Sequence, residues 1–145
     1  MKTLACGLLL LALHGPALAA DEGIGHIQTL QGSVWIERGG QRLPVAPGTE
    51  VRRGDLIRTG MPGAVGIVLS DHSSVSLGSG SELAMETYDF DPREGRFALV
   101  MRMVRGSFAY LSGLIGKLSP ESIRLKVPDA TIAVRGTKLL VDIPE

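Results

Sequence analysis

Apolar and polar residues alternate with a period of two along several segments of the chain. Ile123, Leu125 and Val127 are separated by Arg124 and Lys126, so one face of this segment is apolar and the other is charged. The same period recurs at Val75 and Leu77, at Leu83 and Met85, and at Phe97, Leu99, Met101 and Met103. Alternation of this kind predicts β-strands with one face in a core and the other in water.

The segment from Ala64 to Leu69 differs because all its residues are apolar or glycine. It predicts a central strand that is buried on both faces. Between the predicted strands lie clusters of turn-forming residues. These clusters are Gly39-Gly40, Pro47-Gly48, residues 60–63, Asp71-His72-Ser73, Gly78-Ser79-Gly80 and residues 91–95. Their spacing predicts a single all-β domain of short antiparallel strands, either a two-layer sandwich or a solenoid-like β stack.

Helical spacing occurs in one short segment, residues 108–118. Four apolar residues recur there at helical intervals, and they are Leu111, Leu114, Ile115 and Leu118. Gly113 and Gly116 interrupt the segment, and each glycine costs about 1 kcal/mol relative to alanine inside a helix. Either a short helix or an apolar loop fits this pattern.

The N-terminus has the order of a secretory signal peptide. Lys2 precedes an apolar run from Leu4 to Leu18, and Ala17-Leu18-Ala19 provides a small-x-small cleavage site. The run is shorter than the ~20 apolar residues of a membrane span, which favours cleavage over a retained N-terminal anchor. We therefore expect removal of residues 1–19 and a periplasmic or secreted mature protein with no stable membrane span.

Cys6 is the one cysteine of the chain, and it lies within the predicted leader. A lipid-attachment site is disfavoured because the hydrophobic region follows Cys6 instead of preceding it. Without Cys6 the mature chain forms no disulfide, so a hydrophobic core must stabilise it. About 125 residues remain, enough for one domain.

The charge balance argues against nucleic acid as a partner. The chain has 15 basic and 15 acidic residues, and loss of Lys2 leaves a net charge of −1. Nucleic-acid binding favours a basic patch. The densest basic cluster, Arg52-Arg53 with Arg58, is diluted by Glu50 and Asp55. The same balance argues against binding anionic lipid by charge alone.

Residues able to carry catalysis are few. After the leader the histidines are His26 and His72, which lie far apart in sequence and are expected in solvent. Gly78-Ser79-Gly80 lacks the third glycine of a dinucleotide-binding loop and the length of a nucleophile elbow. We therefore predict a non-enzymatic protein without a cofactor.

Two acidic groups remain as metal candidates. Asp71 stands beside His72, and Asp89, Asp91 and Glu94 lie close together. A metal site usually needs three or four ligands in fixed geometry, and the second group lacks the length and final glutamate of an EF-hand loop. An acidic turn that closes a hairpin from residue 85 to residue 97 is the simpler interpretation, so no metal site is predicted.

The order of glycine turns is the most specific feature of the chain. Gly54-Asp55 leads into a short strand ending at Thr59-Gly60, and Val134-Arg135-Gly136-Thr137 lies near the C-terminus. With Gly32-Ser33-Val34 and Gly48-Thr49, these motifs resemble the FecR domain family of bacterial envelope proteins. The resemblance covers residues 32–141. It implies an extracytoplasmic interaction module, because the family is known for relaying signals at the periplasmic face in iron-uptake regulation.

Two positions depart from the family pattern. Members usually carry Asp-Gly where this chain has Asp71-His72, and an aromatic residue where it has Leu139. His72 tolerates a positive φ better than most residues other than glycine. Leu139 keeps an apolar side chain in the core, so neither departure changes the expected fold.

The family-motif residues have a structural interpretation of their own. They are Gly54, Asp55, Thr59, Gly60, Arg135, Gly136 and Thr137. Asp55 and Thr59 can bond turn backbone, and Arg135 can bind loop carbonyl groups or pair with Asp55. Gly136 is expected in a bulge or a positive-φ turn between two core strands. We expect these residues to hold turns in register, with a binding surface as the alternative.

The chain thus divides into a signal peptide (1–19), a lead-in (20–31), a FecR-like domain (32–141) and a tail (142–145). The resemblance implies a protein-interaction or signalling accessory module whose partner is another envelope protein, such as a receptor or sensor. The alternative is a small envelope module that binds glycan or peptidoglycan, with Trp35 as a platform residue. Sugar platforms favour aromatic side chains, and the mature chain has few.

Overall fold

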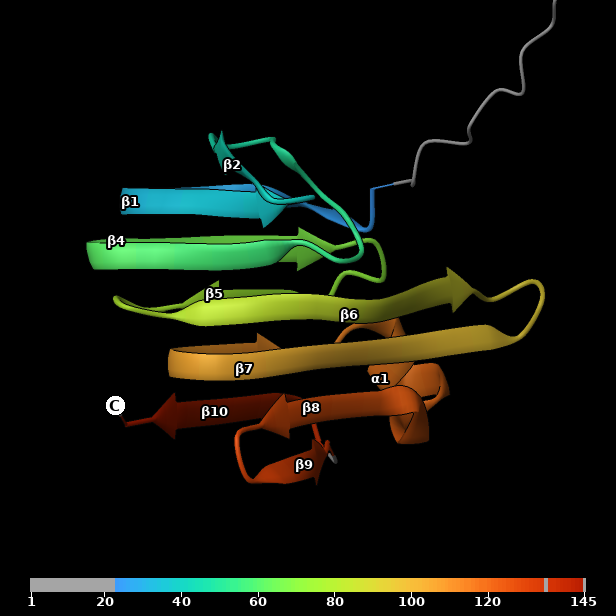
Figure 1. Cartoon of the computed structure of the whole chain (residues 1–145). Coiled ribbons are helices and arrows are strands. Elements are labelled where there is room, and N and C mark those ends of the chain that lie inside the picture. Colours follow the sequence, from blue (N-terminus) through green and yellow to red (C-terminus); the bar gives the residue numbers. More distant parts are fainter. Residues whose placement is uncertain (1–22, 135, 145) are drawn as a thin grey trace, which may run out of the picture.

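The structure, a computed structural model, describes residues 23–134 and 136–144 and consists almost entirely of β-strands (Figure 1). The strands are β1 (Gly25–Arg38), β2 (Gln41–Pro44), β3 (Glu50–Val51), β4 (Leu56–Leu69), β5 (Ser74–Leu77), β6 (Glu82–Asp91), β7 (Arg96–Leu111), β8 (Ile123–Val127), β9 (Ala130–Ala133) and β10 (Lys138–Ile143). Helix α1 (Leu114–Leu118) and a single 3₁₀ turn (Pro120–Ser122) connect β7 to β8. The prediction of a single all-β domain is confirmed.

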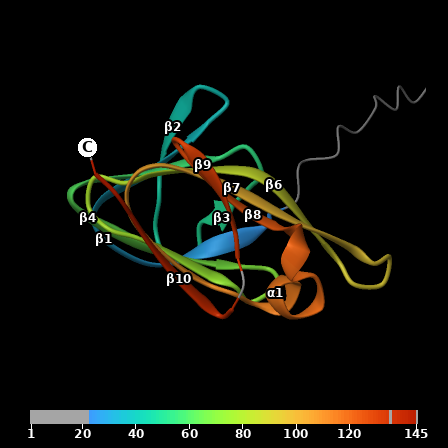
Figure 2. The same ribbon diagram turned by 90° about the horizontal axis from the view of Figure 1, so that it is seen from below.

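The strands form one sheet that is bent double into two layers. The register of β4 shows the bend, because residues 56–58 pair with β6 whereas residues 65–68 pair with β5. Strand β7 does the same, with its first part against β6 and its last part against β5 and β10. The front layer therefore holds β2, β6, β8 and β9, the back layer holds β3, β5 and β10, and β1, β4 and β7 run through both (Figures 1 and 2).

The observed fold has features of both predicted architectures, the two-layer sandwich and the solenoid-like stack. The molecule has two layers, and its long strands also stack like the rungs of a solenoid (Figure 1). The expectation of short strands is wrong for β1, β4 and β7, since they contain 14, 14 and 16 residues. The expectation of antiparallel pairing holds except between β7 and β8, which are parallel.

Glycines allow the long strands to turn from one layer to the other. A Cβ at Gly63 would lie 2.7 Å from the carbonyl oxygens of both Gly60 and Ser33. At Gly106, which has a φ of +100°, a Cβ would lie 2.5 Å from the Cα of Ser81. Because real Cβ atoms do not approach so closely, only glycine fits where these backbones meet.

Core side chains come from alternate positions on the inner faces of both layers. In the second half of β4, Val65, Ile67 and Leu69 are buried, whereas Ala64, Gly66 and Val68 are only half-buried. The prediction that residues 64–69 form a central strand is confirmed, because β4 has neighbours on both sides. The prediction that this strand is buried on both faces is wrong, because its outer face has no second layer over it in the described structure.

The segment around α1 adopts the short helix, one of the two forms that its sequence allows. A parallel pair cannot be joined by a tight hairpin, so β7 must reach β8 through a crossover, and α1 with the 3₁₀ turn supplies it. Ile115 on α1 is fully buried and anchors the crossover to the core.

The ends of the sheet extend into segments that the sequence places outside the domain. Strand β1 begins at Gly25, within the predicted lead-in, and Ile27 is fully buried. Strand β10 runs to Ile143, within the predicted tail. The predicted signal peptide lies outside the described residues. Among the described residues, no helix is long and apolar enough to cross a membrane.

Candidate functional site

Asp55, the carboxylate of the first motif, is fully buried in the turn between β3 and β4. Its two oxygens receive hydrogen bonds of 2.8 and 2.7 Å from Nε and Nη2 of Arg38, which lies at the end of β1. Oδ2 also accepts the backbone N–H of Arg52 at 2.8 Å. The hydrogen bonds to Asp55 raise the pKa of the Arg38 guanidinium. The carboxylate is thus neutralised inside the protein and has no open side for a substrate.

Thr59 and Gly60 lie at the other end of the first half of β4, where the sheet bends. The Thr59 hydroxyl donates to the carbonyl of Gly78 at 2.6 Å and accepts the N–H of Ser81 at 2.9 Å. The Gly60 carbonyl accepts the N–H of Gly80 at 3.1 Å. These bonds tie the β5–β6 connection to the bend of β4.

The closing motif lies beside the α1 crossover, away from Asp55 and Thr59. Gly136 has a φ of +111°, so the predicted positive φ is confirmed. The strands that it joins, β9 and β10, have no fully buried residue, so the expectation of two core strands is wrong. The hydroxyl of Ser112 donates to the Gly136 carbonyl at 3.3 Å, and the Ser112 N–H donates to the Thr137 carbonyl at 2.8 Å. Arg135 lies outside the described residues, and so does its predicted contact with Asp55. The described motif residues therefore occupy three separate places and do not form one site.

The sequence does not predict a buried polar cluster around Asp71. Oδ1 of Asp71 accepts the hydroxyl of Ser73 at 2.6 Å and that of Tyr88 at 3.2 Å, while Oδ2 accepts the N–H of Ile115 at 3.2 Å. The cluster joins the turn after β4 to β6 and to α1. Asp71-His72-Ser73 signals the turn, and His72 has the anticipated positive φ of 66°. Nothing in the local sequence points to Tyr88.

Two buried tyrosines near this cluster have altered pKa values. Burial, and then the charge of Asp71, raise the pKa of Tyr88 above its ordinary value. The same two causes raise the pKa of Tyr110, which is almost fully buried. Both phenols are therefore held in their neutral form, as expected of groups that support the core.

Asp89 and Asp91, two of the candidate metal ligands, lie beside a basic side chain. In the β6–β7 hairpin, Arg96 lies 3.7 Å from Asp89 and 3.2 Å from Asp91. His26 and His72 are exposed. Within residues 23–134 and 136–144, no three potential ligands gather around a common point.

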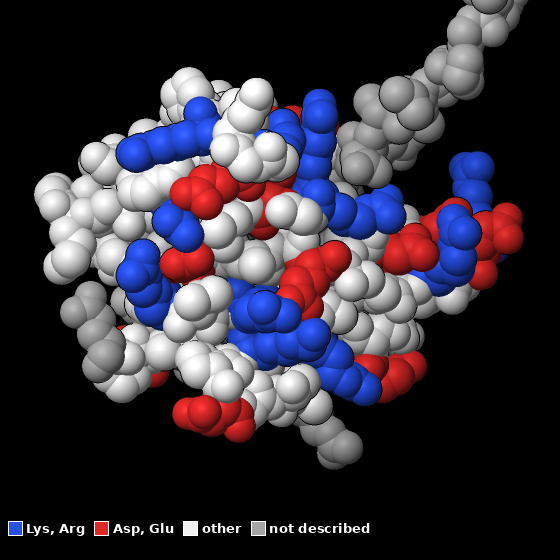
Figure 3. All heavy atoms as spheres, in the orientation of Figure 1, with Lys and Arg blue, Asp and Glu red and all other residues white. Residues whose placement is uncertain are grey.

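Ion pairs cover the outer face of the front layer (Figure 3). Arg58 on β4 lies 3.2 Å from Glu37 and 3.1 Å from Glu82, which lies 3.4 Å from Arg105 on β7. Further along, Glu86 on β6 pairs with Arg102 on β7 and with Lys126 on β8. Charges of opposite sign thus alternate across neighbouring strands and largely neutralise one another.

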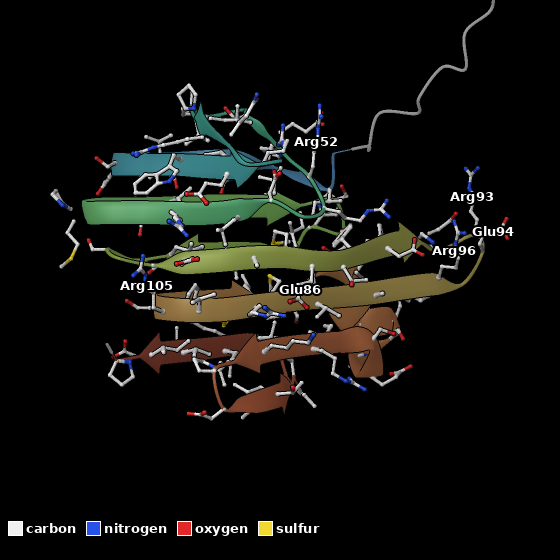
Figure 4. All side chains as sticks on the ribbon, in the orientation of Figure 1. Arg52, Glu86, Arg93, Glu94, Arg96 and Arg105 are labelled. Carbon is white, nitrogen blue, oxygen red and sulfur yellow. The ribbon has the colours of Figure 1, made fainter. Side chains whose placement is uncertain are left out.

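The β6–β7 hairpin projects beyond the other strands on the side of the stack opposite the bend (Figures 1 and 4). Phe90 and Phe97 face each other one residue pair before the turn, with ring centroids 6.2 Å apart. Beyond them the tip displays Arg93 and Glu94, both exposed and both without an ion pair in the described part of the chain. A polar hollow of about 240 Å³ lies beside the base, lined partly by Arg53 and Arg96.

The aromatic side chains form no open platform. Tyr88, Tyr110 and Phe108 are buried, and Phe90 packs on Phe97. The guanidinium of Arg42 lies 3.9 Å from the centre of the Trp35 ring, so it covers one face of this side chain.

Comparison with known proteins identifies a family. A family model described as "FecR protein" matches residues 55–145, more than half of the chain, which confirms the resemblance seen in the sequence. Among solved structures, a chain described as "Cell surface anchoring domain" is 32% identical, with 42% of this chain and 82% of that chain covered and a TM-score of 0.41. No curated protein matches the chain.

Proposed function

The chain belongs to the FecR family, and we propose that it is a non-enzymatic accessory module that binds another protein in the bacterial envelope. Membership of this family fits an envelope-associated module. The buried chemistry supports an interaction role, because Asp55 and Asp71 are both fully buried and both fully engaged by internal hydrogen bonds. Function then has to reside on the surface.

The single observation that carries the proposal is the shape and charge of the β6–β7 hairpin. It extends past the sheet with an aromatic pair next to its turn, and its tip holds Arg93 and Glu94, which form no ion pair in the described structure. On the front face, by contrast, the charges already pair with one another. Unpaired charges on a projecting element steer and orient a partner protein. We therefore assign the partner contact to the hairpin and to the hollow beside it.

A glycan-binding module is the less favoured alternative. Sugar binding would use exposed aromatic rings, and the aromatic side chains of this protein are buried, paired or covered by Arg42. The family-motif residues are equally poor candidates for a ligand site, since the described ones bond to backbone groups and lie in three places. We propose that they hold the bends and turns of the sheet.

The proposed compartment is the periplasm, reached through cleavage of residues 1–19. N-terminal sequencing of protein from the periplasmic fraction tests this proposal. A start at Ala20 is expected, whereas an intact Met1 in the membrane pellet would contradict it.

Hydrogen exchange maps the surface that the partner covers. The protein is compared in buffer and in an envelope extract of its own organism, then recaptured and digested. Peptides from residues 86–97 should exchange more slowly in the extract, while peptides from residues 34–38 should exchange equally in both. Equal exchange of the hairpin under both conditions would exclude it as the partner contact.

A further inference from the structure

Strand β10 has one free edge. It pairs with β7 along residues 138–143, and no described strand lies on its other side. Seen from below, β10 lies near the viewer at the end of the stack (Figure 2). A free edge presents unpaired N–H and C=O groups and is therefore a template for another strand.

The register identifies the residues that face this edge. The Thr137 carbonyl accepts the N–H of Ser112 on the β7 side. Backbone groups of an antiparallel strand point to opposite edges at alternate residues. Thr137, Leu139, Val141 and Ile143 therefore bond toward β7, whereas Lys138, Leu140 and Asp142 direct their N–H and C=O groups outward. The side chains of these last three residues are exposed, and Leu140 is 68% exposed.

The three outward residues are complementary to themselves. We propose that β10 pairs antiparallel with β10 of a second copy of this chain, about a two-fold axis at Leu140. Lys138 of each copy then lies opposite Asp142 of the other, which gives two ion pairs. The two Leu140 side chains meet at the axis. The contact is isologous, so it closes as a dimer and does not propagate. Opposite charges directly across a strand pair stabilise it, and like charges destabilise it.

The same residues disfavour other pairings. A parallel, in-register pair would place Lys138 on Lys138 and Asp142 on Asp142. A shift of two residues would place Lys138 opposite Leu140 or opposite Pro144, which has no N–H to donate. Charges on an edge strand often prevent association, but here they oppose only the wrong registers.

The apolar end of the stack gives a second argument. Five hydrophobic side chains that pack on the core from the last rung are only partly buried, namely Val127, Ile132, Leu139, Val141 and Ile143. Stacked β folds need a cap where the last rung would otherwise expose its core. A second copy joined through β10 brings two such ends together. The hairpin lies at the side of the molecule and takes no part in this contact.

Charge reversal and restoration test the pairing. We measure the dimer dissociation constant of the full-length chain, as expressed, by analytical ultracentrifugation. Lys138→Asp and Asp142→Lys should each weaken the dimer about tenfold, because each creates two like-charge pairs. The double variant Lys138→Asp/Asp142→Lys should return to the original constant, and Glu94→Lys at the hairpin tip should leave it unchanged. The proposal would be overturned if the protein is a monomer at all concentrations, or if the single variants dimerise as tightly as the double variant.

A cysteine at the axis tests the register. In a Cys6→Ser background, Leu140→Cys should form a disulfide-linked dimer, because facing residues in an antiparallel pair lie about 5.5 Å apart at Cα, within disulfide reach. Asp142→Cys should not form a disulfide between the two chains. Residue 142 of one chain lies opposite residue 138 of the other, so the two cysteines are four residues apart along the paired strands. A linked dimer of the Asp142→Cys variant, with none of the Leu140→Cys variant, would refute this register. Neither result depends on the partner of the hairpin. A negative result here would therefore refute the dimer without refuting the proposed function, and the reverse also holds.

Discussion

At the scale of single residues, two buried aspartates are neutralised in different ways. Asp55 faces a guanidinium that remains partly exposed, with 29% of the Arg38 side chain accessible to solvent. Asp71 faces only hydroxyl and amide donors. A buried carboxylate is tolerated only when such donors replace its lost water. Both residues therefore matter to stability through what they bind.

Asp55→Asn should lower the free energy of unfolding by about 2–4 kcal/mol. The change removes one partner of a buried pair and leaves the Arg38 guanidinium without its counter-charge. Urea unfolding measures the loss. Asp129→Asn in the exposed β8–β9 turn is the matched control and should change stability by no more than about 0.5 kcal/mol. Equal, small losses in both variants would mean that the pair contributes little.

Alkaline pH should destabilise the protein through its two buried tyrosines. Their pKa values are raised in the folded state, so the unfolded chain loses these protons first, at a pH of about 10. Their contribution to stability is therefore complete below that pH and declines above it, by about 1.4 kcal/mol per pH unit for each tyrosine.

Thermal unfolding from pH 8 to pH 11 measures this decline. Tyr88→Phe loses its hydrogen bonds to Asp71 and should be less stable than the natural protein at pH 8. Its stability should then fall less steeply above pH 10. Parallel curves for the two proteins would show that Tyr88 has an ordinary pKa.

At the scale of elements, the bend of the sheet depends on close backbone contacts. Gly106→Ala should cost about 2–4 kcal/mol, since its Cβ would meet Ser81 and its positive φ is unfavourable for alanine. Gly95→Ala at the hairpin tip is the control, because Gly95 also has a positive φ but no atom near its missing Cβ. Its cost should be about 1–2 kcal/mol, from the positive φ alone. Thermal melts compare the two, and equal losses would indicate that the bend can open to admit a side chain.

The sequence predicts where strands occur better than it predicts where each strand ends. The period of two identifies β5, β6, β8 and the first half of β7, and the unbroken apolar run identifies the second half of β4. Residues 60–63 are expected to end a strand, yet β4 continues through them. Glycine signals a chain reversal and a bend within a strand equally well, so local pattern does not separate the two.

The contacts of the candidate site are harder to predict because they depend on register. Arg38 meets Asp55 only because residues 34–37 of β1 lie beside residues 56–59 of β4. Tyr88 on β6 meets Asp71 in the turn after β4. Both partners are distant in sequence, and no spacing rule links them. The positive φ at His72 and Gly136, by contrast, follows from residue type and local turn pattern.

At the scale of the whole molecule, the bent sheet separates three regions. One side of the stack is closed by the bend, the opposite side carries the projecting hairpin, and the last rung exposes the edge of β10 (Figure 1). The front face lies between them with its charges paired. This arrangement allows a copy of the chain and a different protein to bind at once, on separate surfaces.

The central claim, that the hairpin contacts an envelope protein, is tested most directly by site-specific photo-cross-linking in living cells. A photoreactive residue replaces Arg93 at the hairpin tip or, as the control, Gln41 on the exposed strand β2. We expect one discrete adduct with a different envelope protein from position 93 and none from position 41. Equal adducts from both positions, or no adduct from position 93 in cells that contain the folded protein, would contradict the account.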